Sequence, residues 1–349
     1  MAVMPQTSIF VEETALHYHL ELNLRPGATD ADVVVAVRAA RRIATGNHFP
    51  NAVWGFNPDL WRRLEPGGVP SNVMPFQGIR GTGGVAPQTQ SDIWFWCNGN
   101  AYEKLWQTAY AVLKALEPVA VLERQLSAFI GRDNRDPSGF IDGTENPALD
   151  EALEISVVPD SVPGAGGIPI FVQKWIHRMT AFEALPVAEQ ERVFGRTKEE
   201  SVQLPPAQMP ATSHVSRNTI LDADGEEMHI YRRNTPYAQM DEIGSLFIGC
   251  AADPGRIDLM LERMFGATAD GLIDNFTKYS DAVSGSYYFA PSMNALTAVF
   301  GSLNPDDDDA DVQDPVSADA AGGGTSDASG DLRIGSLRDV VGLALSDEH

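Results

Sequence analysis

Cysteine is scarce in this sequence, with only Cys97 and Cys250 among 349 residues. Two cysteines cannot build a disulfide framework, and nothing around them suggests a cysteine metal site. Long hydrophobic runs are also missing, because no stretch approaches the roughly 18 apolar residues of a membrane-spanning helix. Residues 1–8 have no basic region followed by an apolar core, as a secretion signal would. We therefore expect a cytoplasmic protein with no membrane partner.

Basic residues are few: 25 Lys and Arg stand against 48 Asp and Glu, which gives a net charge of −23. Residues 304–331 hold nine aspartates and no base, and residues 332–349 add one further negative charge. About −13 remains on the rest of the chain. A surface of this sign repels phosphate backbones and anionic lipids, so it disfavours nucleic-acid and membrane partners.

The hydrophobic pattern predicts alternating strands and helices. Residues 11–22 alternate as a half-buried strand should, with Leu16, Tyr18, Leu20 and Leu22 on one face and His17, His19 and Glu21 on the other. A helix is expected over residues 29–43, where Thr29 and Asp32 resemble a capping box. A second strand over 92–97 precedes a helix over 101–116.

The same order of elements recurs later in the chain. A strand over 167–177 and a helix over 187–194 echo the first pair, and a strand over 245–250 with a helix over 256–265 echoes the second. Cys97 and Cys250 hold equivalent places in the two copies. We predict an α+β fold of two ferredoxin-like halves with antiparallel sheets, over residues 1–150 and 151–303. A single doubly wound sheet is the alternative, which the lack of a Gly-rich strand-to-helix turn disfavours.

The end of the chain changes character. Residues 304–331 are rich in Asp, Ala, Gly and Ser and predict a disordered acidic linker. Residues 332–349 carry apolar side chains again, and an apolar peptide on a flexible tether suggests a docking segment. The alternative is a terminal strand or helix that folds back onto the body.

Single residues give only weak signals of chemistry. His17 and His19 have the spacing of metal ligands, but solvated histidines on a polar strand face are the better interpretation. His214 alone favours a structural role, and the cations of residues 230–236 favour a solvated strand end. Asp142 lies in a turn-rich string whose plain interpretation is a loop.

In combination, the motifs resemble a known family. The string at 139–147 (GFIDGTENP) is similar to the signature of the dye-decolourising peroxidases, and the chain resembles their bacterial B-type members over residues 8–300. The likeness continues at 195–198 (GRTK), 213–220 (SHVSRNTI), 232–234 and 285–292 (GSYYFAPS). The tail resembles the C-terminal peptide that packages such peroxidases in encapsulin shells, which weakens the fold-back alternative.

The resemblance implies one haem b per subunit in the second half, with His214 as the iron ligand and Asp274 as the carboxylate behind it. Asp142, Arg232 and Asn234 would lie on the peroxide side, where Asp142 moves a proton and Arg232, ranked first, stabilises negative charge. The remaining residues that it places at the haem are Glu145, Asn146 and Pro147 along the edge, and Tyr287, Tyr288 and Phe289 in the pocket wall.

The implied activity is the reduction of hydrogen peroxide with one-electron oxidation of aromatic dyes or phenols, and of Mn²⁺ as a further donor. We expect a homo-oligomer loaded into an encapsulin compartment through residues 332–349. The alternatives are a haem-handling protein of the deferrochelatase kind and a non-catalytic haem-storage cargo. Retention of Asp142, Arg232 and Asn234 argues against storage, which needs His214 but no charge opposite it.

Overall fold

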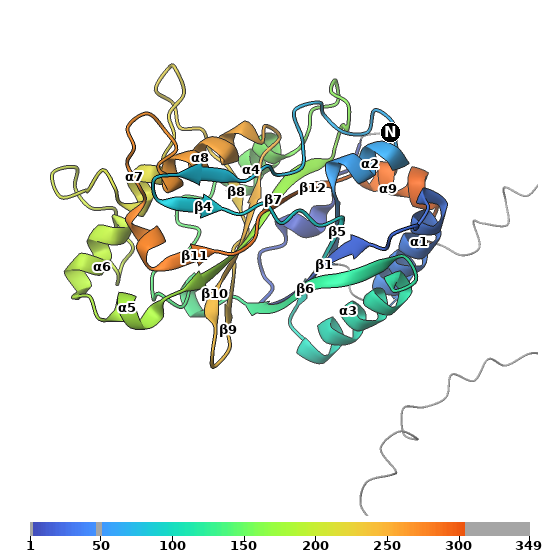
Figure 1. Cartoon of the computed structure of the whole chain (residues 1–349), viewed down its shortest axis with the longest axis horizontal. Helices are drawn as coiled ribbons and strands as arrows, with labels where there is room; N and C mark the ends of the chain where they lie inside the picture. The colour runs from blue at the N-terminus through green and yellow to red at the C-terminus, as the bar shows by residue number, and fades with distance from the viewer. Residues whose placement is uncertain (1–2, 47–50, 304–349) are drawn as a thin grey trace, which may run out of the picture. The chain divides into compact units, whose positions relative to one another are not determined.

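The computed structural model describes residues 3–46 and 51–303 (Figure 1), so the predicted linker 304–331 and docking segment 332–349 lie outside the described residues. The α-helices are α1 (Asp30–Gly46), α2 (Pro58–Leu64), α3 (Tyr102–Leu116), α4 (Leu149–Ser156), α5 (Met179–Glu183), α6 (Val187–Phe194), α7 (His214–Asn218), α8 (Gly255–Phe265) and α9 (Met293–Phe300). Short 3-10 turns are η1 (Thr7–Phe10), η2 (Arg132–Asn134) and η3 (Asn275–Lys278). The strands are β1 (Leu16–Leu24), β2 (Ala52–Phe56), β3 (Ile79–Gly81), β4 (Gly84–Ala86), β5 (Ile93–Gly99), β6 (Ala120–Phe129), β7 (Ile168–His177), β8 (Tyr231–Arg232), β9 (Thr235–Ala238), β10 (Ile243–Cys250), β11 (Ser280–Ala282) and β12 (Ser286–Ala290).

The main sheet repeats one topology twice. Its strand order is β6-β1-β5-β2 followed by β12-β7-β10-β8. Numbered along the chain within each half, both orders read 4-1-3-2, which is the ferredoxin-like arrangement. The pairings of this sheet are antiparallel. The predicted α+β duplication is therefore confirmed, and the doubly wound alternative, which needs parallel strands, is excluded.

The two cysteines mark the duplication. Cys97 lies in β5 and Cys250 in β10, the third strand of each half, and both are buried free thiols. The halves join where β2 pairs with β12 at Phe56 and Phe289. Because α4 runs across residues 150 and 151 and the sheet is continuous there, the domain boundary at that point stays a prediction.

Each half-sheet has one face under its own helices and one face in a shared layer. The shared layer contains Trp94 and Trp96 from β5 and Ile170 and Val172 from β7, together with Tyr288 from β12. Helices α1 and α3 cover the outer face of the first half, and α8 covers part of the outer face of the second. Because α8 covers only part of the outer face of the second half, a site can form on that face beside the helix.

The prediction that β1 is half-buried, with a solvated polar face, is wrong. His17, His19 and Glu21 are only 1%, 2% and 3% exposed. Their face points into the layer between the half-sheets, where Trp96 donates to His17 Nδ1 at 3.1 Å and Tyr288 donates to Glu21 at 2.9 Å. The strand pattern gave the correct faces, but side chains of the other half of the sheet lie where the polar face was expected to meet water.

Several element boundaries follow local chemistry. The strand predicted from residue 11 begins only at Leu16, and residues 7–10 before it form η1. The capping interaction predicted for α1 is confirmed, since the Thr29 hydroxyl donates to Asp32 Oδ2 at 2.6 Å and accepts from the Asp32 N–H at 3.2 Å. The other predicted helices and strands lie within two residues of the observed ones.

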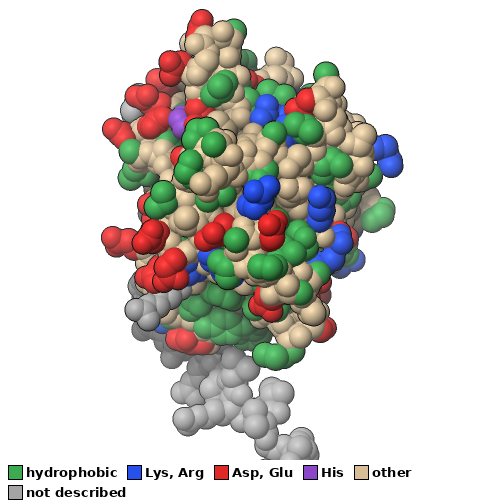
Figure 2. Space-filling model, turned by 90° about the vertical axis from the view of Figure 1, so that its left-hand side faces the viewer, with side chains coloured by type: hydrophobic (Ala, Val, Ile, Leu, Met, Phe, Trp, Pro, Cys, Tyr) green, Lys and Arg blue, Asp and Glu red, His purple; other side chains and the backbone are tan. Residues whose placement is uncertain are grey.

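The surface carries both signs of charge. On the face that lies at the left of Figure 1, acidic side chains gather along one side and Lys and Arg lie nearer the middle (Figure 2). Within residues 3–46 and 51–303, no helix has both the length and the apolar character to cross a bilayer.

Candidate active site

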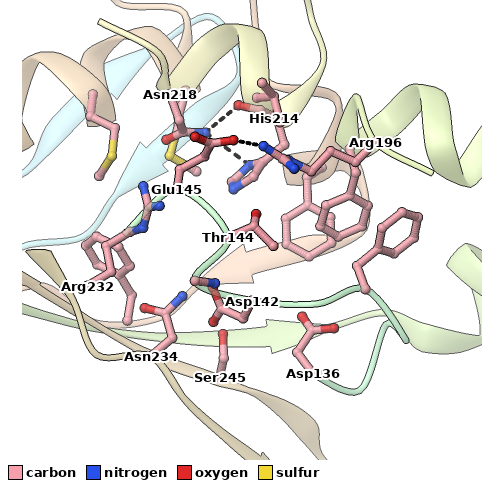
Figure 3. Close-up of a pocket in the computed structure, with 18 of the residues that line it drawn as sticks. Asp136, Asp142, Thr144, Glu145, Arg196, His214, Asn218, Arg232, Asn234 and Ser245 are labelled. Carbon is pink, nitrogen blue, oxygen red and sulfur yellow. Dashed lines mark hydrogen bonds and ion pairs between the residues drawn. The ribbon is translucent and has the colours of Figure 1, made fainter. Parts of the chain in front are cut away.

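The second half encloses a cavity of about 1140 Å³, partly open to solvent (Figure 3). Its walls come from the loop over residues 136–145, from α7 and α8, and from the inner strands β7 and β10. The apolar part of the lining is Phe140, Phe194, Phe247, Met260, Leu261, Met264 and Phe276, and the polar part includes Asp142, Arg196, His214, Asn218, Arg232 and Asn234. A large apolar pocket with a few converging polar groups is the usual form of a cofactor site.

His214 enters this cavity as the first residue of α7. Its Nδ1 lies 2.6 Å from Asp274 Oδ2, and Asp274 is fully buried. Burial opposes protonation of the imidazole, but the Asp274 carboxylate outweighs it and raises the pKa of His214. With Nδ1 held by the carboxylate, Nε2 is the ring nitrogen left for a metal in the cavity.

The local sequence holds this histidine rigidly. Ser213 caps α7 by accepting from the Ser216 N–H at 3.2 Å. Arg217 binds both carboxylate oxygens of Asp270 and donates to the Arg263 carbonyl of α8 at 2.9 Å. Asp274 also caps η3 through its second oxygen, so the carboxylate behind His214 is fixed at both oxygens.

Asp142 reaches the cavity from a short hairpin. Its N–H donates to the Asn134 carbonyl at 2.8 Å, and Arg135 and Ile141 pair across the hairpin. Gly143 has φ +77°, a left-handed conformation that favours glycine, and its N–H donates to Asp142 Oδ1 at 2.7 Å. In Figure 3, Asp142 and Asn234 lie on the opposite side of the cavity from His214.

Residues 231–235 place alternate side chains on two sides. Arg232 and Asn234 line the cavity, whereas Tyr231, Arg233 and Thr235 point into the layer between the half-sheets. There Arg233 lies over the Trp96 ring and Thr235 contacts His19 Nε2 at 3.2 Å. Burial lowers the pKa of Arg232, and the charge of Asp142 counteracts that shift. The predicted solvated basic strand end is therefore a wall of the cavity.

The predicted haem-edge residues separate into two groups. Glu145 lines the cavity and forms an ion pair with Arg196. Asn146 and Pro147 are absent from the lining formed by the described residues, and the Asn146 amide instead holds the backbone of Arg232. It donates to the Arg232 carbonyl at 2.8 Å and accepts from the Arg232 N–H at 3.0 Å.

The prediction that residues 287–289 wall the pocket is wrong. Tyr287 packs beneath α8 and donates to Asp258 at 2.8 Å, Tyr288 lies in the shared layer, and Phe289 belongs to the core of the first half. Strand β12 is an inner strand of the sheet, and none of its residues is among the cavity lining described above.

Sequence reasoning missed several polar residues of the cavity, among them Asn218, Arg196 and Asp136. Asn218 donates to the His214 carbonyl at 2.7 Å, Arg196 pairs with Glu145, and Asp136 lines the wall beside Asp142. Asn218 and Arg196 lie inside strings that carried the family resemblance, so those strings were the available signal. Asp136 precedes the GFIDGTENP string and had no signal of its own.

Known proteins match both the sequence and this geometry. The family model for the C-terminal part of Dyp-type peroxidases matches residues 133–295. A dye-decolorizing peroxidase of Mycobacterium tuberculosis is 35% identical over 249 residues, covering 70% of this chain and 74% of that one. One from Brevibacterium linens is 33% identical over 311 residues, covering 86% and 84%.

Solved structures agree. The encapsulated DyP-type peroxidase of Mycobacterium smegmatis superposes with a TM-score of 0.79 at 32% identity, covering 84% of this chain and 98% of that one. DypB of Rhodococcus jostii gives a TM-score of 0.77 at 31% identity, covering 86% and 99%. The fold and the sequence together define a peroxidase. The chain belongs to the dye-decolorizing (Dyp-type) peroxidase family.

Proposed function

We propose that this peroxidase binds one haem b in the cavity with His214 as the ligand of its iron. The imidazole with a free Nε2, backed by the buried Asp274 carboxylate, is the observation that carries the proposal. The residues fit the group: aromatic and Met side chains suit the porphyrin faces, and Arg196 and Arg232 put positive charge in the lining of a cavity that would take an anionic porphyrin. Variants of Rhodococcus jostii DypB have been solved in complex with heme.

Bound haem supplies two-electron redox chemistry at its iron. The protein supplies the proton and the charge. Cleavage of peroxide needs a proton that is taken from one of its oxygens and returned to the oxygen that departs, and Asp142 faces the cavity to carry it. The Arg232 guanidinium stabilises the negative charge that develops as the O–O bond breaks. The Asn234 carboxamide orients peroxide between them; its Oδ1 has no partner among the described residues.

The test is reconstitution with haem. The purified chain should show a Soret band, and His214→Ala should lose most of it. His229→Ala is a matched control, because the two side chains are 35% and 32% exposed and, of the two, His214 is the one that lines the cavity. Full haem binding by His214→Ala, or equal loss in both variants, would contradict the assignment.

We further propose aromatic dyes and phenols as electron donors, with Mn²⁺ as an additional donor. The partly open cavity allows electron transfer at the edge of the bound group. A DypB variant has been solved in complex with manganese. Stopped-flow mixing with peroxide separates this enzyme from a haem-handling or haem-storage protein: an enzyme responds with a fast Soret change that a phenol then reverses, and a carrier responds with neither.

We also propose that the protein is a homo-oligomeric cargo of an encapsulin compartment in the cytoplasm, docked through residues 332–349. The support is the apolar sequence of this segment behind an acidic linker and the encapsulated Mycobacterium smegmatis neighbour. Deleting residues 332–349 should leave peroxide turnover intact and abolish co-purification with a co-expressed shell protein. Retention of the truncated chain in the shell would reject this docking role.

A further inference from the structure

A further carboxylate faces the cavity from the same wall as Asp142. Asp136 lines the same wall, and Figure 3 shows both acids on the side of the cavity opposite His214. None of the peroxidase roles proposed above uses Asp136.

The hairpin geometry relates the two acids. The Asp136 N–H donates to the Phe140 carbonyl at 3.1 Å, the Asp142 N–H donates to the Asn134 carbonyl at 2.8 Å, and Arg135 pairs with Ile141 between them. Residues opposite each other in an antiparallel ladder share a face, so Asp136 and Asp142 are diagonal neighbours on one face. The backbones of such neighbours lie about 7–8 Å apart, so their carboxyl groups are close enough for water in the cavity to link them.

The surroundings of Asp136 favour a group that exchanges a proton. Its Oδ1 accepts from the N–H of Ser138 at 2.9 Å and from the Ser138 hydroxyl. Burial raises the pKa of Asp136 to about 7; the Ser138 hydrogen bonds oppose this shift, the Asp142 charge adds to it, and His214 acts against it. This acid therefore keeps its proton to a higher pH than an exposed carboxyl group does.

The nearby cations have other partners. Arg135 donates to the carbonyls of Gly139 and Lys198, both at 2.8 Å. Lys198 donates to Gln190 Oε1 at 2.6 Å and lies over the Phe140 ring. The Arg232 guanidinium interacts with the charge of Asp142. Among the described residues, Asp136 has no salt-bridge partner within 4 Å.

Peroxide reduction consumes two protons besides those of peroxide itself. The balanced half-reaction is H₂O₂ + 2H⁺ + 2e⁻ → 2H₂O, with the electrons taken one at a time from two donor molecules. The two protons of peroxide leave with the first oxygen as water, so two more must reach the second oxygen, one with each electron. A single carboxyl group delivers one proton and must then be reprotonated, which a second carboxyl group on the same wall can do.

We propose that Asp136 is the second proton donor of this cavity and that it passes its proton through water to Asp142 and the reacting oxygen during the donor-oxidation half of the cycle. The inference rests on the proposed haem peroxidase function. In this proposal, Asp142 transfers the proton during peroxide cleavage. Asp136 and Asp142 together supply protons for the release of the second oxygen as water.

Asp136→Asn tests this, because the amide keeps an acceptor for Ser138 and cannot release a proton. In stopped flow, the Soret change with peroxide should keep its rate within about 2-fold, while the later reduction by a phenol should slow about 10-fold and lose its inflection near pH 7. Asp160→Asn, which removes an exposed carboxylate, is the control and should leave both phases unchanged.

An infrared measurement gives a readout besides turnover. The difference spectrum between about pH 6 and pH 8 should contain a carboxylic-acid C=O band that Asp136→Asn removes, with or without haem. Ser138→Ala removes a hydrogen bond to the charged form of Asp136 and should shift the titration of this band to higher pH. It is the variant to use if Asp136→Asn does not fold.

An unchanged phenol phase in Asp136→Asn, an unchanged band in either variant, or a slowed peroxide phase would each overturn the proposal. Failure to bind haem would sink the peroxidase proposal instead, while the haem-free spectrum still tests Asp136.

Discussion

At the scale of single residues, the site depends on charges that the fold holds apart. His214 and Asp274 form a pair on one side, and Arg232 and Asp142 interact on the other. A guanidinium stays protonated at any working pH, and inside a cavity with a largely apolar lining it acts on developing negative charge more strongly than it would in solution.

Replacing Arg232 with Leu should therefore slow the Soret change with peroxide by about 100-fold or more, while haem binding through His214 remains. Arg80→Leu removes an exposed positive charge outside the cavity and is the matched control. If the rate in Arg232→Leu stays near that of the wild type, the role in bond cleavage belongs to Asp142 or to Asn234.

At the scale of elements, one short segment joins the cavity to the rest of the molecule. Alternate side chains over residues 231–235 face the cavity and the shared layer, and Asn146 binds the backbone of Arg232 through both ends of its amide. The loop that contains Asp142 is thus attached directly to the strand that contains Arg232. The spacing of Asp142 and Arg232, the two groups proposed to act on peroxide, depends on this link.

Asn146→Ala should break the link without touching the cavity wall. The Arg232 N–H loses its partner, at a cost of about 1–3 kcal/mol in the free energy of unfolding. We expect roughly a 10-fold slower peroxide reaction, smaller than for Arg232→Leu, with an unchanged Soret maximum. Asn146→Asp keeps the acceptor for the N–H and should recover part of the rate; no recovery would argue against positioning through the backbone.

At the scale of the whole molecule, a buried polar layer holds the halves together. His17 and His19 are neutral there: burial and the nearby Arg233 charge lower the pKa of His17 to about 3, and burial lowers that of His19 well below its usual value. Their folded pKa values lie below the unfolded value of 6.5. The unfolded chain consequently binds more protons as pH falls.

This linkage gives the sign of the pH dependence. The contribution of His17 is fully present above pH 6.5 and is lost as pH falls from there toward about 3. Urea unfolding should show a less stable protein at about pH 5 than at pH 7, with roughly 2 kcal/mol of the loss due to His17. His17→Gln keeps an acceptor for Trp96 and cannot titrate, so its loss over this range should be smaller by that amount. Equal losses would contradict a neutral buried His17.

Periodicity and capping were readable because they are local. The Thr29–Asp32 cap, the strand over 245–250 and the helix over 256–265 depend on neighbours within a few residues. The repeated order of elements was sufficient for the ferredoxin-like duplication. The burial of His17 and His19 could not be predicted from the local sequence, because it depends on residues of the second half of the sheet, such as Thr235, far along the chain.

For the site, the sequence by itself determined the family resemblance, the identity of the candidate residues and the chemistry open to each side chain. Only the tertiary structure decided which of them meet. In the structure, His214 is hydrogen-bonded to Asp274, and Asp142 lies on the opposite side of the cavity. The Asn146 side chain binds the backbone of Arg232. Tyr287 lies outside the cavity wall, and Asp136 lies in it. The physical reason is that a side chain's chemistry belongs to the residue, whereas its pKa, its partners and its access to a cavity are set by groups distant in sequence that folding brings within a few ångströms.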